Sequence, residues 1–252
     1  MKTLTILTGS SSGLGLAMAR QLLSTDGRLL CIARRTSNDL AQRAADLNAP
    51  FTQWSMDLAH GAQVAQRLEQ WLARHAHEGF ASATLINNAG AITRVVPVSE
   101  LAPEDIDRAL AVSLAAPMHL SAAFLRATRG WSATRRVLNI SSGLARRPMA
   151  AQSTYCAAKA GLDHFTRVLA LEEGARVAAL SPGGIDSDLM TQLRDADPRH
   201  FPDHATFVDA KASGRLMSPE TAARRTLQFL DRPDFGHTPI ADLRDHPLTT
   251  GA

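Results

Sequence analysis

The sequence predicts an α/β fold: a doubly wound parallel sheet of about seven strands with helices on both faces. Short apolar runs of strand length alternate with longer stretches of helical periodicity, and the connections between them are a few residues long. This alternation is typical of parallel strands joined by crossover helices. With 252 residues, 45% hydrophobic and 20% charged, the chain is long enough for one large domain, which we expect to span residues 1–252.

The expected elements follow this rhythm along the chain. Strands are predicted at residues 4–8, 28–33, 51–56, 83–86, 136–140 and 175–180, and helices at residues 14–24, 36–47, 63–75, 103–127 and around 152–172. Residues from about 186–216 are rich in Pro, Asp and His, and are expected to form an irregular, mobile flap over the carboxyl ends of the strands. A further helix is expected from Ser218, because an N-cap serine precedes a proline and an acid.

Composition argues against several classes of protein. The net charge of +3 is small and the Arg-Arg pairs are scattered without interleaved aromatic residues, so no nucleic-acid partner is expected. Cys31 and Cys156 fall in a predicted strand and a predicted helix, which favours buried thiols and a reducing compartment. We find no targeting signal and no apolar run of membrane-spanning length, so no membrane association and a cytoplasmic location are expected. The histidines show no spacing typical of a metal site.

The only tyrosine of the chain, Tyr155, is followed four residues later by Lys159, one of three lysines. Residues four apart share a helix face, so both side chains can reach one pocket. A nearby ammonium stabilises a phenolate, and we therefore expect Lys159 to lower the pKa of Tyr155 from its usual value of about 10. The alternative is a half-buried tyrosine beside a solvated lysine, and the pair alone does not decide between the two.

A glycine-rich turn, Thr8-Gly-Ser-Ser-Ser-Gly-Leu-Gly15, follows the first predicted strand and opens a helix. Glycines permit a sharp turn and a close approach of the backbone to a pyrophosphate, and free N–H groups at the helix start attract the anion. The spacing G-x-x-x-G-x-G differs from the commonest dinucleotide fingerprint, and similar turns occur in proteins that bind no nucleotide.

The end of the second predicted strand indicates which nucleotide would bind. An acid there binds the 2′-hydroxyl of NAD, whereas a basic residue accommodates the 2′-phosphate of NADP. The chain has Arg34 and Arg35 at this point and no acid, so NADP(H) is expected, with Arg34 as the main ligand and Arg35 and Ser10 as helpers. Arg34 could instead be a solvated loop residue. Asp57, just past the third strand, could contact the adenine or cap the next helix.

Together these segments resemble the short-chain dehydrogenase/reductase family over nearly the whole chain, and the resemblance implies a Rossmann-type fold. The matches stand in order at strand ends: Thr8-Gly-x-x-x-Gly-x-Gly15, Asp57, Asn87-Asn-Ala-Gly90, Asn139-Ile-Ser-Ser142, Tyr155-x-x-x-Lys159 and Pro182-Gly183. Within the family, the stretches Ser141-Ser-Gly143, 155–162 and 213–219 most resemble the sepiapterin reductase and benzil reductase branch.

The resemblance implies an NADPH-dependent reduction of a ketone, a diketone or an aromatic or pterin-like carbonyl to an alcohol. Tyr155 would donate a proton to the carbonyl oxygen and Ser142, thirteen residues earlier, would hydrogen-bond it. Lys159 would lower the tyrosine pKa and hold the nicotinamide ribose. The implied cofactor-binding residues are Gly9, Ser10, Ser12, Gly13, Leu14, Gly15, Arg34, Arg35, Asp57, Leu58, Asn88, Ala89, Gly90, Tyr155, Lys159, Pro182, Gly183, Ile185 and Ser187.

One position departs from the family pattern. Relatives commonly carry an asparagine in the fourth helix that supports a water feeding protons to the lysine, and this chain has Ser113. A serine serves with little loss if the asparagine acts through its backbone carbonyl, and impairs the relay if the amide is needed. We expect a working enzyme.

The flap and the loop after Ser142 carry apolar side chains that suit an apolar or aromatic carbonyl. The candidates are Leu144, Met149, Met190, Leu193, Phe201 and Phe207. Packing of the flap on the domain would explain the same residues, and acids in the flap leave room for a pterin-like substrate.

The predicted helices around 103–127 and 152–172 have apolar residues on more than one side. Relatives associate through these helices, so a homodimer or homotetramer is expected. An NAD-dependent alcohol or polyol dehydrogenase is favoured if Arg34 points away from the ribose. A non-catalytic NADP-binding sensor of the same fold is supported by Ser113 alone.

Overall fold

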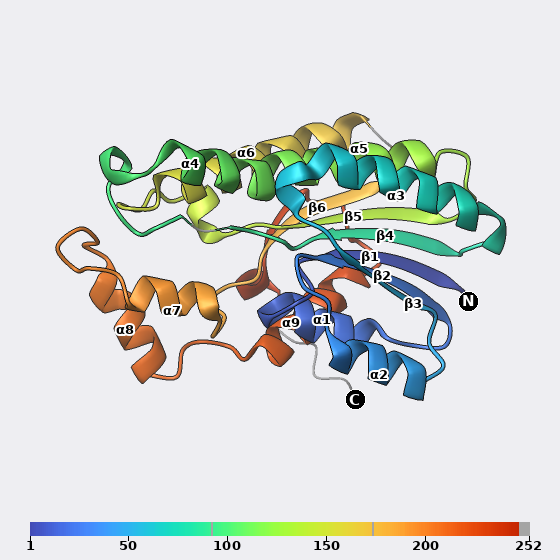
Figure 1. Ribbon diagram of the computed structural model, residues 1–252, viewed down its shortest axis with the longest axis horizontal. Coiled ribbons are helices and arrows are strands. Elements are labelled where there is room, and N and C mark those ends of the chain that lie inside the picture. The colour runs from blue at the N-terminus through green and yellow to red at the C-terminus, as the bar shows by residue number, and fades with distance from the viewer. Residues whose placement is uncertain (92, 173, 247–252) are drawn as a thin grey trace.

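A computed structural model of the chain describes residues 1–91, 93–172 and 174–246, and it contains one seven-stranded parallel sheet (Figure 1). The strand order is β3-β2-β1-β4-β5-β6-β7. This confirms the predicted doubly wound Rossmann-type fold. The strands are β1 (Thr3–Thr8), β2 (Gly27–Ala33), β3 (Phe51–Ser55), β4 (Ser82–Asn87), β5 (Thr134–Ile140), β6 (Arg176–Ser181) and β7 (Ile240–Asp242).

Helices cover both faces of the sheet, in two layers (Figure 1). On one face lie α1 (Gly13–Leu22), α2 (Asn38–Asp46) and α9 (Pro219–Leu230). On the other lie α3 (Gly61–His75), α4 (Pro103–Leu110), α5 (Ala116–Ala127) and α6 (Ser153–Glu172). Short 3-10 turns complete the connections at η1 (Leu58–His60), η2 (Ala76–Glu78), η3 (Val98–Glu100), η5 (Gly143–Ala145) and η6 (Leu243–Asp245).

Helices cover both faces of the sheet, so residues at consecutive positions of β1, β2, β4 and β6 are buried. Side chains alternate across a strand, so Leu4 and Ile6 of β1 enter the core under α3 and α5, whereas Leu7 enters the core under α1 and α9. The sheet therefore separates two hydrophobic cores.

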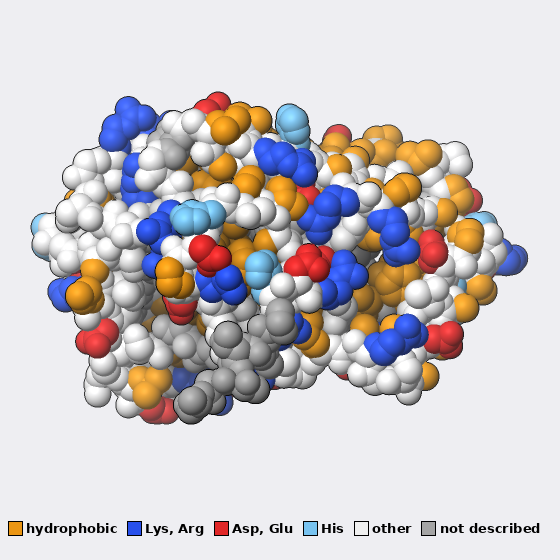
Figure 2. Space-filling view, turned by 180° about the vertical axis from the view of Figure 1, so that it is seen from behind, with side chains coloured by type: hydrophobic (Ala, Val, Ile, Leu, Met, Phe, Trp, Pro, Cys, Tyr) orange, Lys and Arg blue, Asp and Glu red, His pale blue; other side chains and the backbone are white. Residues whose placement is uncertain are grey.

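Figure 2 shows the molecule from behind, and on this side of its surface basic and acidic side chains are interspersed.

The predicted helix 103–127 is interrupted by a π-helical turn, η4 (Ala111–Ala115), between α4 and α5. By length and composition the stretch Pro103–Ala127 could cross a membrane, which corrects the expectation that no apolar run is long enough. In its most apolar 18-residue part, 56% of the residues are buried. Leu120 and Phe124 of α5 are fully buried in the core with α3. A buried helix in the core of a globular domain can have the same length and composition, so these two properties are weak support for a membrane span.

The segment expected to be irregular holds two helices, α7 (Asp188–Arg194) and α8 (His204–Ala212), next to the carboxyl ends of the strands (Figure 1). The sequence did not predict them because the segment is rich in Pro, Asp and His, the two helices are short, and α7 buries only Leu193 while α8 has no buried residue. Leu193 and Phe201 are buried in a third apolar cluster with Met149. The predicted start of α9 is confirmed, since Oγ of Ser218 accepts a hydrogen bond from the N–H of Thr221.

The close packing of the glycine turn predicts a large effect of substituting Gly9. Gly9 and Gly79 both have a left-handed backbone, with φ of +71° and +65°. A Cβ on Gly9 would lie 2.8 Å from Cα of Ala89, whereas one on Gly79 would meet nothing within 4 Å. Gly79→Ala should lower the free energy of unfolding by about 1–2 kcal/mol from backbone strain alone. Gly9→Ala should cost about 1–3 kcal/mol more, measured by urea denaturation; equal losses in both variants would refute the clash.

Candidate active site

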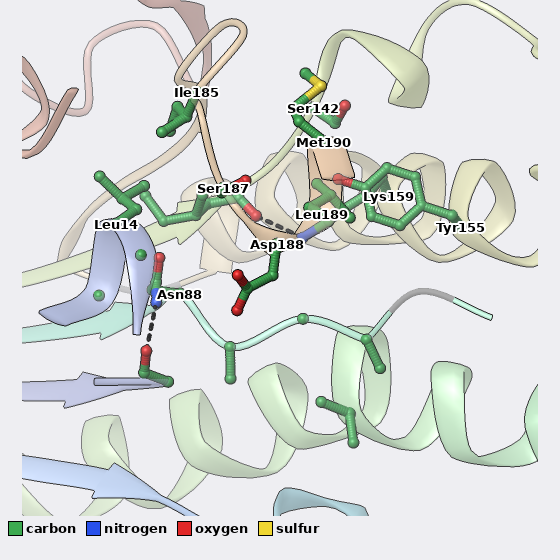
Figure 3. A pocket seen from close by; sticks show the side chains of 18 of the residues that line it. Leu14, Asn88, Ser142, Tyr155, Lys159, Ile185, Ser187, Asp188, Leu189 and Met190 are labelled. Atoms are coloured by element: carbon green, nitrogen blue, oxygen red, sulfur yellow. Dashed lines mark hydrogen bonds between the residues drawn. The ribbon is translucent and has the colours of Figure 1, made fainter. Parts of the chain in front are cut away.

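A cleft of about 950 Å³ lies at the carboxyl ends of the strands, bounded by the glycine turn, by α6 and by α7 (Figure 3). It brings together nearly all of the predicted site residues. The exceptions are Ser10, Phe201 and Ser113, which do not line it. Lining residues that the sequence did not single out include Ser11, Thr93, Arg108, Arg147, Gln152, Leu189 and Gln192.

The glycine turn is braced by the end of β4. Nδ2 of Asn88, a residue labelled in Figure 3, donates to the carbonyls of Thr8 and Gly9 at 3.0 and 3.2 Å. Oγ1 of Thr8 accepts from the N–H groups of Asn88 and Ala89 at 3.0 and 3.1 Å. A Cβ on Gly15 would lie 2.0 Å from the carbonyl oxygen of Gly9, so only glycine fits there. The predicted role of Asn88 in the cofactor cleft thus has a structural component.

The N-terminus of α1 has the features of an anion site. Ser12 is its N-cap, yet the side chain makes no capping hydrogen bond, and the first turn contains no acid. The first N–H groups of an α-helix have no intrahelical partner and carry a partial positive charge. Gly13, with φ of +51°, leaves the approach open, because a Cβ there would come no nearer than 3.9 Å to the nearest atom, Cβ of Ser187. These features suit a pyrophosphate.

Arg34 and Arg35 line the cleft at the end of β2, and both are exposed. Ser10, in contrast, is 3% exposed, and its hydroxyl hydrogen-bonds the thiol of Cys31. Burial raises the pKa of that thiol to about 12. The prediction that Ser10 helps to bind the 2′-phosphate is wrong in this geometry, since its side chain turns into the core and Ser11 lines the cleft instead.

Asp57 lines the cleft and also caps the short helix η1, the second of the two roles that the sequence left open. Its Oδ1 accepts from the N–H of Ala59 at 3.0 Å, and its Oδ2 lies 2.9 Å from Nη2 of Arg108. The N–H of Ala59 and the Arg108 guanidinium hold the pKa of Asp57 below its usual value. Arg108, from α4, also lines the cleft, and nothing in its position in the sequence predicted this.

Tyr155 and Lys159 face one pocket from α6, and Ser142 follows β5 (Figure 3). Tyr155 is buried, and its burial raises the pKa of the phenol, while a hydrogen bond with Ser142 acts in the opposite direction. The expected lowering of this pKa by Lys159 is therefore wrong for the free protein. Nζ of Lys159 lies 5.8 Å from the centroid of the Tyr155 ring.

The alternative of a solvated lysine is excluded, because Lys159 is 3% exposed. Its Nζ donates to the carbonyl of Ile140 at 2.7 Å, which ties α6 to the end of β5. Burial lowers the pKa of the ammonium to about 8, and the nearby Asp163 carboxylate opposes this shift. A fully buried lysine thus changes its charge close to neutral pH.

Asp163 is a buried carboxylate that sequence reasoning missed. It lies one helical turn beyond Lys159 and is 2% exposed. Its Oδ1 accepts from the hydroxyl of Ser141, and its Oδ2 lies 3.6 Å from Nη1 of Arg146. An acid at i+4 from the lysine on the apolar face of α6 was the available signal.

Ser113 lies in the π-helical turn η4 and is 1% exposed. Its Oγ accepts from the N–H of Ala91 at 3.0 Å and donates to the carbonyl of Ala91 at 3.3 Å. A Cβ on Gly90 would lie 3.8 Å from Nζ of Lys159 and 3.9 Å from Oγ of Ser113, so Gly90 is flanked by both groups. π-Helical turns are frequent at functional sites.

Five of the six predicted substrate residues line the cleft: Leu144, Met149, Met190, Leu193 and Phe207. They also pack on one another, so both interpretations given by the sequence apply. Phe201 does not line the cleft. It is fully buried beneath Phe207, with the two ring centroids 5.5 Å apart, and the prediction that it contacts substrate is wrong. In the described part of the chain, no three His, Cys, Asp or Glu residues are grouped to hold a metal ion.

The sequence pattern of the short chain dehydrogenase family matches residues 3–198, which include the glycine turn and the Tyr155 and Lys159 pair. The chain belongs to this family. Short-chain dehydrogenases are oxidoreductases that use nicotinamide cofactors, and the family assignment made from the strand-end motifs is confirmed.

Relatives resemble the chain over most of their length. Benzil reductase ((S)-benzoin forming) of Bacillus cereus is 31% identical over 235 residues, which covers 91% of this chain and 94% of that protein. Sepiapterin reductase of Xenopus laevis is 31% identical over 244 residues, with 90% of each chain covered. The structure of a putative 2-deoxy-D-gluconate 3-dehydrogenase from Agrobacterium tumefaciens with bound NADP has a TM-score of 0.77 and 25% identity, and covers 95% of this chain and 94% of that one. The two named branches are therefore confirmed as similar.

The surroundings of Lys159 predict its titration. The ammonium should lose its proton as the pH rises through about 8. Asp163→Asn removes the anion that stabilises the charged form, so the midpoint should move to lower pH. The ¹³Cε shift of labelled lysine reports the titration, the chain has three lysines, and Lys159→Met identifies the signal.

Asp46→Asn serves as the control, because Asp46 is exposed and lies on α2, away from the cleft. That variant should leave the midpoint of Lys159 unchanged. A midpoint that stays in place in Asp163→Asn would contradict the electrostatic role of Asp163.

Proposed function

We propose that this short-chain dehydrogenase is an NADPH-dependent carbonyl reductase that converts a ketone, a diketone or an aromatic or pterin-like carbonyl to an alcohol. The observation that carries the proposal is the placement of Ser142, Tyr155 and Lys159 in one cleft with the glycine turn and with Arg34. A proton donor, an oxygen-binding hydroxyl and a nucleotide cradle thus meet around a single space.

The residues at the polar end of the cleft fit a nicotinamide dinucleotide phosphate. The uncapped N-terminus of α1 and the open approach over Gly13 suit its pyrophosphate. Two exposed arginines and no acid at the end of β2 suit a 2′-phosphate. A similar structure with bound NADP supports the same assignment. Gly183 and Ile185 after β6 and Ser187 at the start of α7 line the other side of this end.

The side chains around Tyr155 suit proton donation. Bound NADPH supplies the hydride. Because burial raises the pKa of Tyr155, the phenol is protonated at neutral pH, which is the form that a reductase needs. The Ser142 hydroxyl hydrogen-bonds the substrate oxygen as negative charge develops on it, and Tyr155 gives its proton to the same oxygen. The ammonium of Lys159 then stabilises the phenolate.

Ser113 supports a relay that restores the proton. Its hydroxyl is fixed by two hydrogen bonds to Ala91, and Gly90 lies between it and the ammonium of Lys159. Because Gly90 has no side chain, a water can lie between the hydroxyl of Ser113 and the ammonium of Lys159 and hydrogen-bond both. We place Ser113 as a positioning residue for that water. The sensor alternative loses its one supporting feature if a serine serves this role.

The apolar end of the cleft supports an apolar or aromatic substrate. Met149 and Leu193 are buried there, and Leu144, Met190 and Phe207 are partly buried. The names of the relatives, benzil reductase and sepiapterin reductase, support an aromatic or pterin-like carbonyl. We further propose a cytoplasmic homodimer or homotetramer through α4, α5 and α6, which leave Met118, Val168 and Leu171 exposed.

Cofactor choice predicts the effect of reversing the charge at Arg34. Arg34→Asp should weaken NADPH binding by roughly 10–100-fold, because a charge-assisted hydrogen bond is replaced by repulsion. NADH affinity should change little. Quenching of cofactor fluorescence measures both constants, and Arg74→Asp, which makes the same change at an exposed position of α3, outside the cleft and the proposed interface, should leave both unchanged. A wild-type preference for NADH would favour the NAD-dependent dehydrogenase instead.

The proposed proton donor predicts a loss of turnover without a loss of cofactor binding. Tyr155→Phe should lower kcat with aromatic diketones by about 10²–10⁴-fold, because the general acid is removed. NADPH binding should stay within a few-fold of wild type. Equal and negligible rates in the wild type and the variant, with intact NADPH binding, would identify the protein as a non-catalytic sensor.

A further inference from the structure

The apolar end of the cleft contains one polar side chain with an unusual position, Gln152. This residue lines the cleft, is 1% exposed and stands three residues before Tyr155. Its neighbours in the third apolar cluster include Met149, Ala151 and Cys156. A buried amide beside the proposed proton donor needs a reason, because burying a polar group without full hydrogen bonding costs free energy.

One end of the Gln152 amide is paired and the other is not. Nε2 donates to the carbonyl of Ala151 at 3.0 Å. Only the NH₂ end of an amide can donate to a carbonyl, so this bond fixes Oε1 as the free end. Oε1 is buried and has no hydrogen-bond partner among the residues that the structure describes. An amide oxygen accepts, so the missing partner is a donor.

The main chain of Gln152 is fixed by hydrogen bonds at the start of α6. Ala151 has φ of +59°, in the left-handed region that is costly for a residue with a Cβ. The N–H of Gln152 donates to the carbonyl of Met149 at 3.3 Å, and its carbonyl accepts from the N–H of Cys156 at 2.8 Å, in the first turn of α6. Strain of this kind collects at sites that bind or react.

We propose that Gln152 is a specificity-determining residue, whose Oε1 accepts a hydrogen bond from a hydroxyl or N–H group next to the reacting carbonyl. The substrate class is then an apolar or aromatic carbonyl compound with one such donor. This inference rests on the proposed reductase function. A buried acceptor left unpaired penalises a substrate that lacks the donor, and it discriminates more strongly than an apolar wall.

Matched probe pairs test the proposal on the wild-type protein with NADPH. 2-Hydroxyacetophenone and 2-methoxyacetophenone differ by the loss of a hydroxyl donor, and isatin and N-methylisatin differ by the loss of an N–H donor. We expect kcat/KM to be roughly tenfold higher for the donor of at least one pair. The pair that shows the preference identifies which donor the substrate carries.

Two variants assign the preference to this residue. Gln152→Leu removes the acceptor and should bring the donor to non-donor ratio of kcat/KM to about one. Gln192→Leu makes the same chemical change at an exposed glutamine that also lines the cleft, and should leave the ratio at its wild-type value. NADPH fluorescence quenching verifies that each variant is folded.

The outcomes separate this inference from the function on which it rests. A ratio near one for both pairs in the wild type, or a ratio that survives Gln152→Leu, overturns the role of Gln152 while the reductase function stands. Failure of the wild type to reduce any carbonyl, with NADPH bound, overturns the reductase function itself. A wild-type ratio near one overturns the role of Gln152 without any variant. If Gln152→Leu does not fold, Gln152→Met, which keeps the length of the side chain and removes the amide oxygen, makes the same test.

Discussion

The 2.7 Å hydrogen bond from Nζ of Lys159 to the carbonyl of Ile140 joins the middle of α6 to the carboxyl end of β5. The hydroxyl of Ser141, which donates to Oδ1 of Asp163, adds a second polar contact between the end of β5 and the helix that carries Tyr155. The Lys159 contact requires a buried ammonium, and burial of a charge is costly unless other groups offset it. The Asp163 carboxylate and the face of the Tyr155 ring supply part of that offset. The position of the tyrosine and the acidity of the lysine therefore have a common origin.

Other strand ends are fixed by side chains that satisfy backbone groups. The side chains of Thr8 and Asn88 each hydrogen-bond the main chain of the other residue, which joins the ends of β1 and β4. The hydroxyl of Ser113 hydrogen-bonds the main chain of Ala91. Nδ2 of Asn87 donates to Oδ1 of Asn139 at 2.9 Å, which joins β4 to β5 beneath the cleft. Buried backbone groups need partners, and polar residues at the strand ends provide them where the ladder stops. The polar motifs of the family thus hold the cleft open as well as facing it.

The cleft has two chemically different ends. Free N–H groups of α1 and the arginines after β2 give one end a positive potential, which suits a phosphorylated nucleotide. The other end is lined by the apolar cluster around Met149 and Leu193, and Gln152 contributes a buried acceptor there. Ser142 and Tyr155 lie where the ends meet (Figure 3). In the proposed function, different residues would therefore determine cofactor affinity and substrate choice.

The sequence by itself determined the parallel sheet, the glycine turn, the basic end of β2 and the Tyr155 and Lys159 pair, because each depends on local spacing or on the alternation of elements. It could not determine that Ser10 turns into the core while Ser11 faces the cleft, or that Phe201 lies beneath Phe207. The helices α7 and α8 were not predicted either, because they are short and bury almost none of their side chains, which leaves no apolar periodicity to mark them. Only the tertiary structure decided the direction in which the pKa of Tyr155 shifts, the burial of Asp163 and the unpaired Oε1 of Gln152. Burial and unpaired atoms depend on neighbours that are distant along the chain, and those neighbours are set when the layers close on one another.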